Sequence, residues 1–362
     1  MKNVICFLTI LLFIASCSKT PEDRSLSGNY DLPKDNISNK LSTYPCIDTL
    51  ILSEYLIKHP LSENEIDSLK KVTTINGGTE KSSSVTANEG EYPEYTDYSG
   101  MIHFKVFYAY NTVKVQHPVL IRSVSDNYAM IGGGAYAYGY SGNGAFLTAS
   151  RPLNSTTWQG QSKDHIVPDP HNLKVFAIGM RIDGVDPAFL KSKIHIVSNT
   201  SAFSDFPNVT ATIPENCLLI GGGAWDNYYG YGNMLVASYP NYIYWQAGGK
   251  AYRRSDPSQI TAYAIGIEDI SYPTVGYLQL TVRQITESAY GDIQYCYAPV
   301  WSGFALTCPG GYCTFNSFGR MLVGLYPQDL FPGSQVISKD TPSYGDYGSN
   351  SSFATGIQKR PY

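Results

Sequence analysis

Two loops rich in aromatic residues carry the side chains best suited to bind a ligand. One follows the glycines 132–134 and the other follows the glycines 221–223. Aromatic rings suit the apolar face of a sugar, and carboxylate or amide groups suit its hydroxyls. Aromatic packing across a turn explains the same residues without a ligand, and both interpretations stay open. The candidate binding residues are Tyr136, Tyr138, Tyr140, Trp225, Asp226, Asn227, Tyr228 and Tyr229.

Metal and catalytic motifs give weaker signals. The segment 164–171, DHIVPDPH, holds two His and two Asp that could ligate a metal. Pro168 and Pro170 also make it a stiff turn, and we predict no metal site and no cofactor. The sequence has no HExxH and no GxSxG, and a carboxylate pair for glycoside cleavage cannot be assigned without a known separation. We therefore assign no catalytic residue.

Cys308 and Cys313 are the cysteines best placed to pair. Pro-Gly-Gly between them can fold the chain back and bring the sulfurs together, and an exported chain permits disulfides. We predict a Cys308–Cys313 disulfide, with two free, half-buried thiols as the alternative. The CxxxxC spacing lacks a partner CxxC, so it does not indicate zinc.

The elements that position these residues form an internal repeat. Gly132 and Gly221 lie 89 residues apart, and a further 89 residues lead to Gly310. Other landmarks keep the same order in each repeat, which makes chance an insufficient explanation. They are Ser150-Arg-Pro, Ser238-Tyr-Pro and Leu325-Tyr-Pro; Trp158-Gln and Trp245-Gln; Lys163, Lys250 and Lys339; and Ala177-Ile-Gly, Ala264-Ile-Gly and Ala354-Thr-Gly.

These landmarks divide residues 101–362 into three units of about 88 residues. We call them the first repeat (101–189), the second repeat (190–277) and the third repeat (278–362). Runs of β-forming residues separated by Gly, Pro, Asn and Asp predict about five strands per repeat and no helix. Glycine within a strand indicates a bulge or the close approach of another backbone.

The fold prediction is therefore all-β, with three equivalent sheets around one axis in a closed, pseudo-threefold, β-prism-like domain. The rival arrangement is three sandwich-like modules in tandem, which gives no reason for the matched glycine triplets. A phosphate-binding loop would need a helix after the glycines, and here strand follows strand.

The N-terminal part has a different composition. Residues 18–100 hold 8 basic and 14 acidic residues, whereas residues 101–362 hold 17 and 16. Residues 1–16 predict a cleaved signal peptide, because the apolar run from Val4 to Ala15 is too short to span a bilayer. Residues 17–100 predict a tether, with short helices at about 47–71 and a linker over 72–100. No basic stripe suggests nucleic acid.

Two resemblances follow from these motifs. Ile14-Ala15-Ser16-Cys17 resembles a bacterial lipobox, and the Lys and acidic residues of 18–23 resemble the export signals of Bacteroidota surface lipoproteins. The resemblance implies lipidation of Cys17, with palmitate among the acyl chains. It also implies an outer-membrane anchor and a cell-surface location, with a periplasm-facing location as the alternative. The GGGA…SxP…W…AIG pattern resembles repeats of uncharacterised secreted bacterial proteins and, loosely, β-prism domains.

The sequence thus predicts a surface lipoprotein with a binding domain that is not an enzyme. A glycan is the leading ligand, and the membrane is a partner through the lipid. A structural or protein-binding component of the envelope, contacting a cell-surface protein, is the alternative. An extracellular hydrolase is third.

Overall fold

The structure is a computed structural model in which the chain divides into two units, Met1–Lys81 and Ser82–Tyr362. It describes residues 87–360 except 229, 254, 269, 271–277, 290, 316–318, 329–331 and 341–346. The predicted signal peptide, Cys17 and the helices at 47–71 lie outside the described residues. We call the unit Ser82–Tyr362 the β domain.

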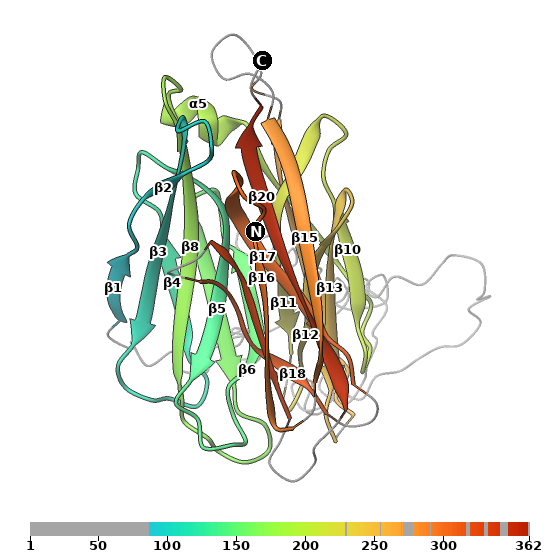
Figure 1. Cartoon of the computed structure of the whole chain (residues 1–362). Coiled ribbons are helices and arrows are strands. Elements are labelled where there is room, and N and C mark those ends of the chain that lie inside the picture. Colours follow the sequence, from blue (N-terminus) through green and yellow to red (C-terminus); the bar gives the residue numbers. More distant parts are fainter. Residues whose placement is uncertain are drawn as a thin grey trace, which may run out of the picture. The chain divides into compact units, whose positions relative to one another are not determined.

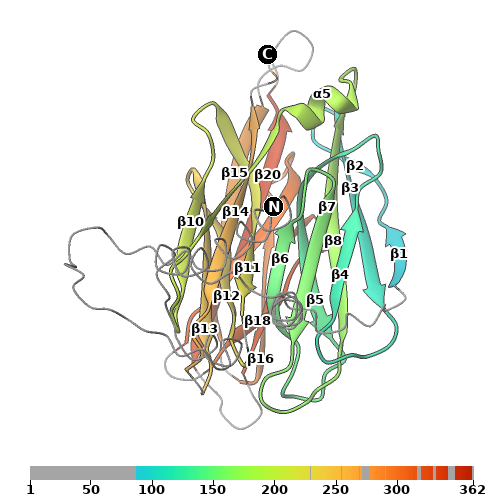
Figure 2. The ribbon, with the colours of Figure 1, turned by 180° about the vertical axis from the view of Figure 1, so that it is seen from behind.

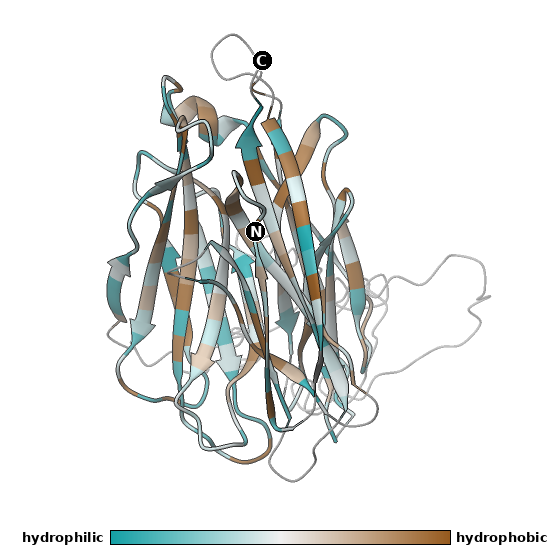
Figure 3. Ribbon diagram, viewed as in Figure 1, coloured by the Kyte–Doolittle hydropathy of each residue, from teal (hydrophilic) through white to brown (hydrophobic). Residues whose placement is uncertain are grey.

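The described part of the chain is almost entirely strands, which confirms the all-β prediction (Figure 1). Apolar and polar residues alternate along many of them, as Figure 3 shows for β15. The strands are β1 (Ala87–Glu91), β2 (Tyr95–Thr96), β3 (Ile102–Asn111), β4 (Val119–Ser123), β5 (Ala129–Tyr138), β6 (Phe146–Pro152), β7 (Thr157–Lys163), β8 (Asn172–Ile182), β9 (Ile194–Thr200), β10 (Asn208–Thr212), β11 (Cys217–Asn227), β12 (Asn233–Asn241), β13 (Tyr244–Ala251), β14 (Gln259–Glu268), β15 (Leu278–Ala289), β16 (Ile293–Pro299), β17 (Ala305–Cys313), β18 (Met321–Pro327), β19 (Gly333–Lys339) and β20 (Gly348–Lys359).

One short helix, α5 (Pro187–Ser192), corrects the prediction of no helix in this region (Figure 2). Asp186 caps it, because its carboxylate accepts a hydrogen bond from the backbone N–H of Phe189 at 2.9 Å. Proline at the first helical position fits its fixed φ. Six residues are too few to give the periodic pattern that identifies a helix in sequence. Within the described residues no helix is long and apolar enough to cross a membrane.

The strands form three sheets, and every pair within them is antiparallel. The first sheet has the order β1-β3-β8-β5-β18-β19-β16, with β2 also paired to β3. The second is β4-β7-β6-β11-β14-β9, and the third is β10-β13-β12-β17-β20-β15. Each sheet ends in two edge strands, so none closes on itself. The presence of three sheets agrees with the prediction, and their closed, pseudo-threefold arrangement around one axis stays a prediction.

Every sheet combines strands from two repeats. The first sheet joins β3, β8 and β5 of the first repeat to β18, β19 and β16 of the third. The second joins β9, β14 and β11 to three strands of the first repeat, and the third joins β15, β20 and β17 to three strands of the second. Each repeat thus contributes six strands, one more than expected. A repeat therefore does not form a sheet of its own.

The glycines lie where backbones of different repeats approach one another, as predicted. A Cβ built on Gly132 would lie 2.2 Å from the Thr307 carbonyl oxygen and 2.9 Å from Cys308 Cβ. A Cβ on Gly221 would lie 2.5 Å from the Ile131 carbonyl oxygen and 3.0 Å from Cys308 Cβ. Real Cβ atoms do not come this close to a backbone oxygen. The glycines thus leave the space that the Cys308 side chain fills.

The alignment of Gly310 with the other two glycines is wrong by two residues. Register shifts fall directly before Gly132, Gly221 and Cys308 in β5, β11 and β17. A β-bulge of this kind fixes which residues share a position. Cys308 is therefore the third-repeat counterpart of Gly132 and Gly221, and Gly310 matches Gly134.

Tryptophan side chains fill the space above the middle glycines. A Cβ on Gly133 would lie 2.4 Å from the Trp158 ring, and one on Gly222 would lie 2.3 Å from the Trp245 ring. Both rings are at most 1% exposed. In the third repeat the counterpart of the tryptophans is the small residue Ser334, beside the bulkier β17 segment that contains Cys308. Large and small side chains therefore alternate across the contact, as dense packing requires.

Residues 87–100 belong to the β domain, which corrects the linker prediction for this range. β1 and β2 pair with β3. Asp97 is 4% exposed, and its carboxylate accepts backbone N–H groups of Ile102 at 3.3 Å and Lys359 at 2.7 Å. The polar composition hid these strands, because β1 lies at the sheet edge, where charged residues are common.

Candidate functional site

A buried lysine lies at the last or the penultimate position of the fifth strand of each repeat. Lys163, Lys250 and Lys339 are at most 2% exposed. The Lys250 ammonium group donates a hydrogen bond to the Gly319 carbonyl oxygen at 2.8 Å, and it lies 3.4 Å from the Phe315 ring centroid. Both partners belong to the loop after β17 in the next repeat. The backbone oxygen and the aromatic ring together replace the water that a buried ammonium group loses.

Tyr140 and Tyr228, predicted as binding residues, occupy the corresponding positions. The Lys339 ammonium group lies 4.2 Å from the Tyr140 ring centroid, and that of Lys163 lies 4.0 Å from the Tyr228 ring centroid. Lys339 also donates to the Gly142 carbonyl oxygen, and burial lowers the pKa of Lys339 to about 8. The lysine of each repeat thereby contacts a loop of the next repeat, and the lysine of the third repeat contacts a loop of the first. The rings of Tyr140 and Tyr228 therefore contact another repeat of the same domain.

Asp226 and Tyr138 are also engaged within the domain. Asp226 is fully buried, and its carboxyl accepts a hydrogen bond from the Ser258 hydroxyl at 2.5 Å. Burial raises the pKa of Asp226 to about 7. The Tyr138 ring stacks on Tyr136, with 5.6 Å between centroids. Asn227 is half-buried beyond Asp226, and Tyr229 lies outside the described residues. The seven predicted residues that the structure describes therefore do not form one platform, and five of them lie on β5 and β11 rather than in loops.

The aromatic residue four positions after the bulge recurs on all three sheets. It is Tyr136 on the first sheet, Trp225 on the second and Tyr312 on the third, and each is half-buried. The preceding alanines Ala135 and Ala224 are fully buried. Because side chains alternate across a strand, the aromatic rings lie on the opposite, outer face. Tyr312 is therefore the third-repeat counterpart of Tyr136 and Trp225.

The middle residue of each SxP or LxP landmark lies beside this ring. On the first sheet Tyr326 stacks on Tyr136 with 4.8 Å between centroids, and on the third Tyr239 lies 5.0 Å from Tyr312. Each pair joins two repeats, because β18 pairs with β5 and β12 pairs with β17. Sequence reasoning missed these partners, although alternation through the landmark places its middle residue on the outer face.

The second sheet carries arginine at this position. The Arg151 guanidinium lies 4.0 Å from the Trp225 ring centroid. Its Nε donates to Gln159 Oε1 at 2.9 Å, and its Nη1 donates to the Tyr263 hydroxyl at 2.6 Å. Two hydrogen bonds and an aromatic ring thus fix the orientation of the guanidinium group. We call Arg151, Trp225, Gln159 and Tyr263 the Arg151 cluster.

The two histidines of the segment 164–171 are buried and bonded within the domain. His165 Nε2 lies 2.8 Å from the Tyr252 carbonyl oxygen, and burial lowers the pKa of His165 to about 4. His171 lies 2.8 Å from both the Ser162 hydroxyl and the Asp169 carbonyl oxygen. Among the described residues no group of three or more His, Cys, Asp or Glu side chains could hold a metal ion.

Cys308 and Cys313 are free thiols, so the predicted disulfide is wrong. Both lie on β17, which pairs with β20 from Ala305 to Cys313. Five residues of extended strand span about 17 Å, whereas a disulfide needs Cα atoms within about 7 Å. Burial raises the pKa of Cys308 to about 11, which disfavours its reactive thiolate form.

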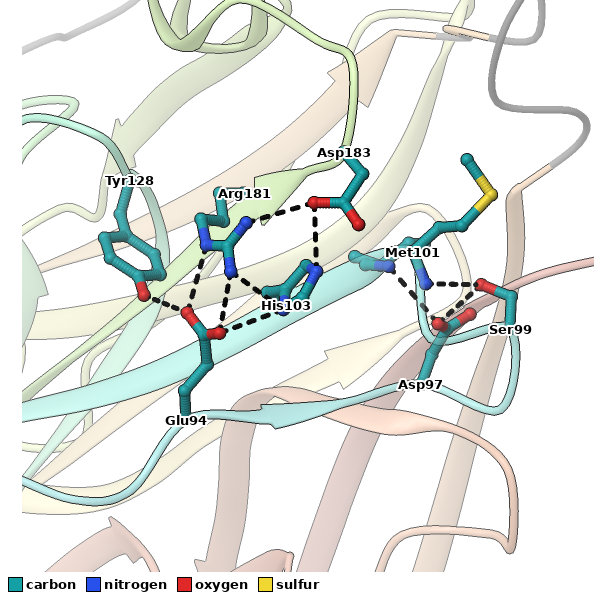
Figure 4. Close-up of polar contacts among 9 residues, drawn as sticks. Glu94, Asp97, Ser99, Met101, His103, Tyr128, Arg181 and Asp183 are labelled. Carbon is teal, nitrogen blue, oxygen red and sulfur yellow. Dashed lines mark hydrogen bonds and ion pairs between the residues drawn. The ribbon is translucent and has the colours of Figure 1, made fainter.

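A cluster of charged residues fastens the N-terminal segment 87–98 to the first repeat (Figure 4). Glu94 accepts hydrogen bonds from Arg181 Nε at 3.0 Å and Nη2 at 2.8 Å, and it accepts another from the Tyr128 hydroxyl. His103 lies between the carboxylates of Glu94 and Asp183, at 2.9 and 3.1 Å. The hydrogen bond from Arg181 is the main cause that lowers the pKa of Glu94 to about 2.

Two further ion pairs act in the same way. Glu91 pairs with Lys105 at 2.7 Å, and Glu89 pairs with Arg122. Three acids of the N-terminal segment thus meet three bases of the first repeat. These groups satisfy one another, so we interpret the cluster as a fastening rather than as a site for a ligand.

Comparisons with protein-family models and with curated proteins find no match to this chain. The function is therefore argued from the geometry of the domain itself.

Proposed function

We propose that the chain is a surface-anchored lipoprotein whose β domain binds a ligand outside the cell without catalysing a reaction. A glycan is the ligand class that fits best. The observation that carries this proposal is the recurrence of a half-buried aromatic ring at one register position on three sheets, in Tyr136, Trp225 and Tyr312. Each ring packs against its cross-strand neighbour and stays half-buried, which leaves part of the ring open to a ligand.

The proposal includes a pseudo-threefold, prism-like arrangement of the domain. The pairing order first–sixth–third strand of one repeat, followed by the fourth, fifth and second strand of another, recurs in all three sheets. The approach of Gly132 and Gly221 to Cys308 supports a common axis. Such an arrangement presents three outer faces of similar shape to solvent, each with its own chemistry.

Binding by the full chain to a glycan array tests the function. For a glycan that binds, Trp225→Ala or Tyr312→Ala should weaken binding at least tenfold while the melting temperature stays within a few degrees. Tyr98→Ala is the matched control, because Tyr98 is an aromatic residue that is 85% exposed and lies outside the three sheets. An array with no binding above background would refute the glycan proposal.

Anchoring is the second part of the proposal, and it rests on the run Ile14–Cys17. Several acyl chains hold a protein at a membrane far more firmly than one. Cys17→Ser should release the protein from the detergent phase in a partition assay. A variant that partitions like the parent would contradict lipidation.

A protein-binding role is the alternative, and one observation favours it. Tyr242 and Ile243, at the tip of the β12–β13 hairpin, are 90% and 60% exposed. Exposed apolar tips commonly mark protein contacts. If Tyr242→Ser and Ile243→Ser abolish adhesion to cells while glycan binding is absent, the protein-binding function replaces the glycan one.

A further inference from the structure

The Arg151 cluster carries a positive charge without a neutralising partner. Among the described residues Arg151 forms no ion pair, although its guanidinium is held by Trp225, Gln159 and Tyr263. A guanidinium has five N–H donors. The hydrogen bonds to Gln159 and Tyr263 use one donor on Nε and one on Nη1, so the remaining donors include both of those on Nη2.

The described residues in the two cross-strand rows around Arg151 include no carboxylate. Pairing through β9, β14, β11, β6, β7 and β4 places two cross-strand rows on the outer face of the second sheet. The residues of these rows are Ser198, Tyr263, Gly223, Arg151, Gln159 and Ile121, followed by Thr200, Thr261, Trp225, Ala149, Gln161 and Val119. Amides and hydroxyls dominate around a single positive charge.

The other two sheets carry tyrosine at the position of Arg151. Tyr326 and Tyr239 hold the position of Arg151 on the first and third sheets, because each is the middle residue of the landmark that pairs with the aromatic strand. Packing beside an aromatic ring is therefore satisfied by tyrosine. An arginine that is oriented but not neutralised points to a ligand with the opposite charge.

We propose that the outer face of the second sheet binds an acidic glycan, with its carboxylate or sulfate on the free donors of Arg151. This inference rests on the proposed glycan-binding function and names the ligand class for one face. Planar guanidinium donors match a carboxylate or sulfate in geometry as well as in charge. The amides of Gln159 and Gln161 and the hydroxyl of the exposed Thr200 suit the hydroxyls of the neighbouring sugars.

Titration of the full chain with three probes tests this inference. The probes are an oligogalacturonate, a sulfated oligosaccharide of equal length and the corresponding neutral oligosaccharide. We expect an acidic probe to bind at least tenfold more tightly than the neutral one, with an affinity that falls as salt rises. Comparison of the two acidic probes identifies the anionic group.

Matched variants locate the binding. Arg151→Gln should reduce acidic-glycan affinity at least tenfold, and Arg151→Lys should restore part of it, because lysine keeps the charge but not the planar donors. Tyr239→Gln, at the same position on the third sheet, should leave acidic-glycan affinity unchanged. Unchanged affinity in Arg151→Gln, with the melting temperature preserved, would overturn the inference.

Two other outcomes separate this inference from the proposed function. Neutral glycans that bind while neither acidic probe does would overturn the acidic-ligand inference and leave glycan binding intact. A polyglutamate peptide that binds as tightly as the acidic glycans would also overturn it, because the face would then recognise negative charge alone. Failure of every glycan would refute the proposed function itself.

Discussion

The junction of the three repeats and the outer faces of the three sheets are formed by the same strands, β5, β11 and β17, but accept different residue types. At the junction, Gly132 and Gly221 leave space for one small side chain, that of Cys308. Four residues further along the same strands, the outer face accepts Tyr136, Trp225 and Tyr312, with Tyr or Arg as the neighbour. Contact with the backbone of another repeat restricts the junction position to glycine or, in the third repeat, cysteine.

The buried lysines show a restriction on residue type that is intermediate between the junction and the outer faces. All three repeats keep lysine, and each ammonium group meets an aromatic ring of the next repeat. The ring itself changes between Tyr140, Tyr228 and Phe315, because any aromatic face can hold a cation. Positions that join repeats therefore keep their chemistry, whereas positions that face solvent diverge, and the divergent positions are where ligand specificity can arise.

The largest single-residue effect is expected where a glycine touches a tryptophan. Gly222→Ala places a Cβ 2.3 Å from both the Trp245 ring and the Tyr263 carbonyl oxygen. Overpacking of this kind costs about 3 kcal/mol of unfolding free energy. Gly248→Ala is the control, since its Cβ would meet nothing closer than 3.2 Å. Equal denaturant midpoints for the two variants would show that the junction is not tightly packed.

Removal of a buried lysine is expected to have the next largest effect. Lys250→Ala deletes the cation under Phe315 and leaves the Gly319 carbonyl oxygen without its donor, at a cost of about 2 kcal/mol. Lys114→Ala is the matched control, because the exposed Lys114 also donates to a backbone carbonyl oxygen, that of Gly139. Equal free energies of urea unfolding for the two variants would show that the buried lysine contacts do not link the repeats.

Fastening of the N-terminal segment is expected to contribute less. Glu94→Gln should cost about 1 kcal/mol at pH 7, because it weakens charged hydrogen bonds to Arg181. The folded-state pKa of Glu94 is about 2, below the unfolded value, so its contribution is present above about pH 4.3 and lost as pH falls towards 2. The melting temperatures of the parent and of Glu94→Gln should therefore differ at pH 7 and become equal at pH 2. The same difference at both pH values would contradict the assignment.

The last prediction concerns Asp226, whose contribution to stability has the opposite pH dependence. Burial raises its folded-state pKa to about 7, above the unfolded value of about 3.9, so the folded chain binds more protons between these values. The contribution of Asp226 to stability therefore falls as pH rises through this window. Asp226→Asn should gain stability relative to the parent from pH 4 to pH 8. A flat difference in unfolding free energy across that range would rule out a buried, titrating carboxyl.

Sequence spacing predicted the features that packing controls. The interval between Gly132 and Gly221, together with the recurring lysines, identified positions that do meet partners from other repeats. All-β structure followed from composition and turn residues. These signals are readable because a contact made at backbone distance tolerates few residue types.

The exchange of strands between repeats could not be predicted, because pairing between distant strands leaves no local pattern. Chain spacing alone also misplaced the third repeat, where a shift of two residues brings Cys308 rather than Gly310 to the junction. The same error hid Tyr312. The disulfide prediction failed for another reason, because Pro-Gly-Gly was interpreted as a turn and lies within the strand β17. Tyr140, Tyr228 and Asp226 have the composition of a binding loop, and only their contacts with Lys339, Lys163 and Ser258 identify them as internal.

Truncation after residue 277 tests most directly whether the three repeats form one interlocked domain. Loss of the third repeat removes β18, β19 and β16 from the first sheet, and leaves β10, β13 and β12 of the third without their partners. We expect the truncated protein to aggregate, or to show no cooperative thermal transition, in calorimetry beside the full chain. A truncated protein that melts cooperatively, within a few degrees of the full chain, would contradict the account.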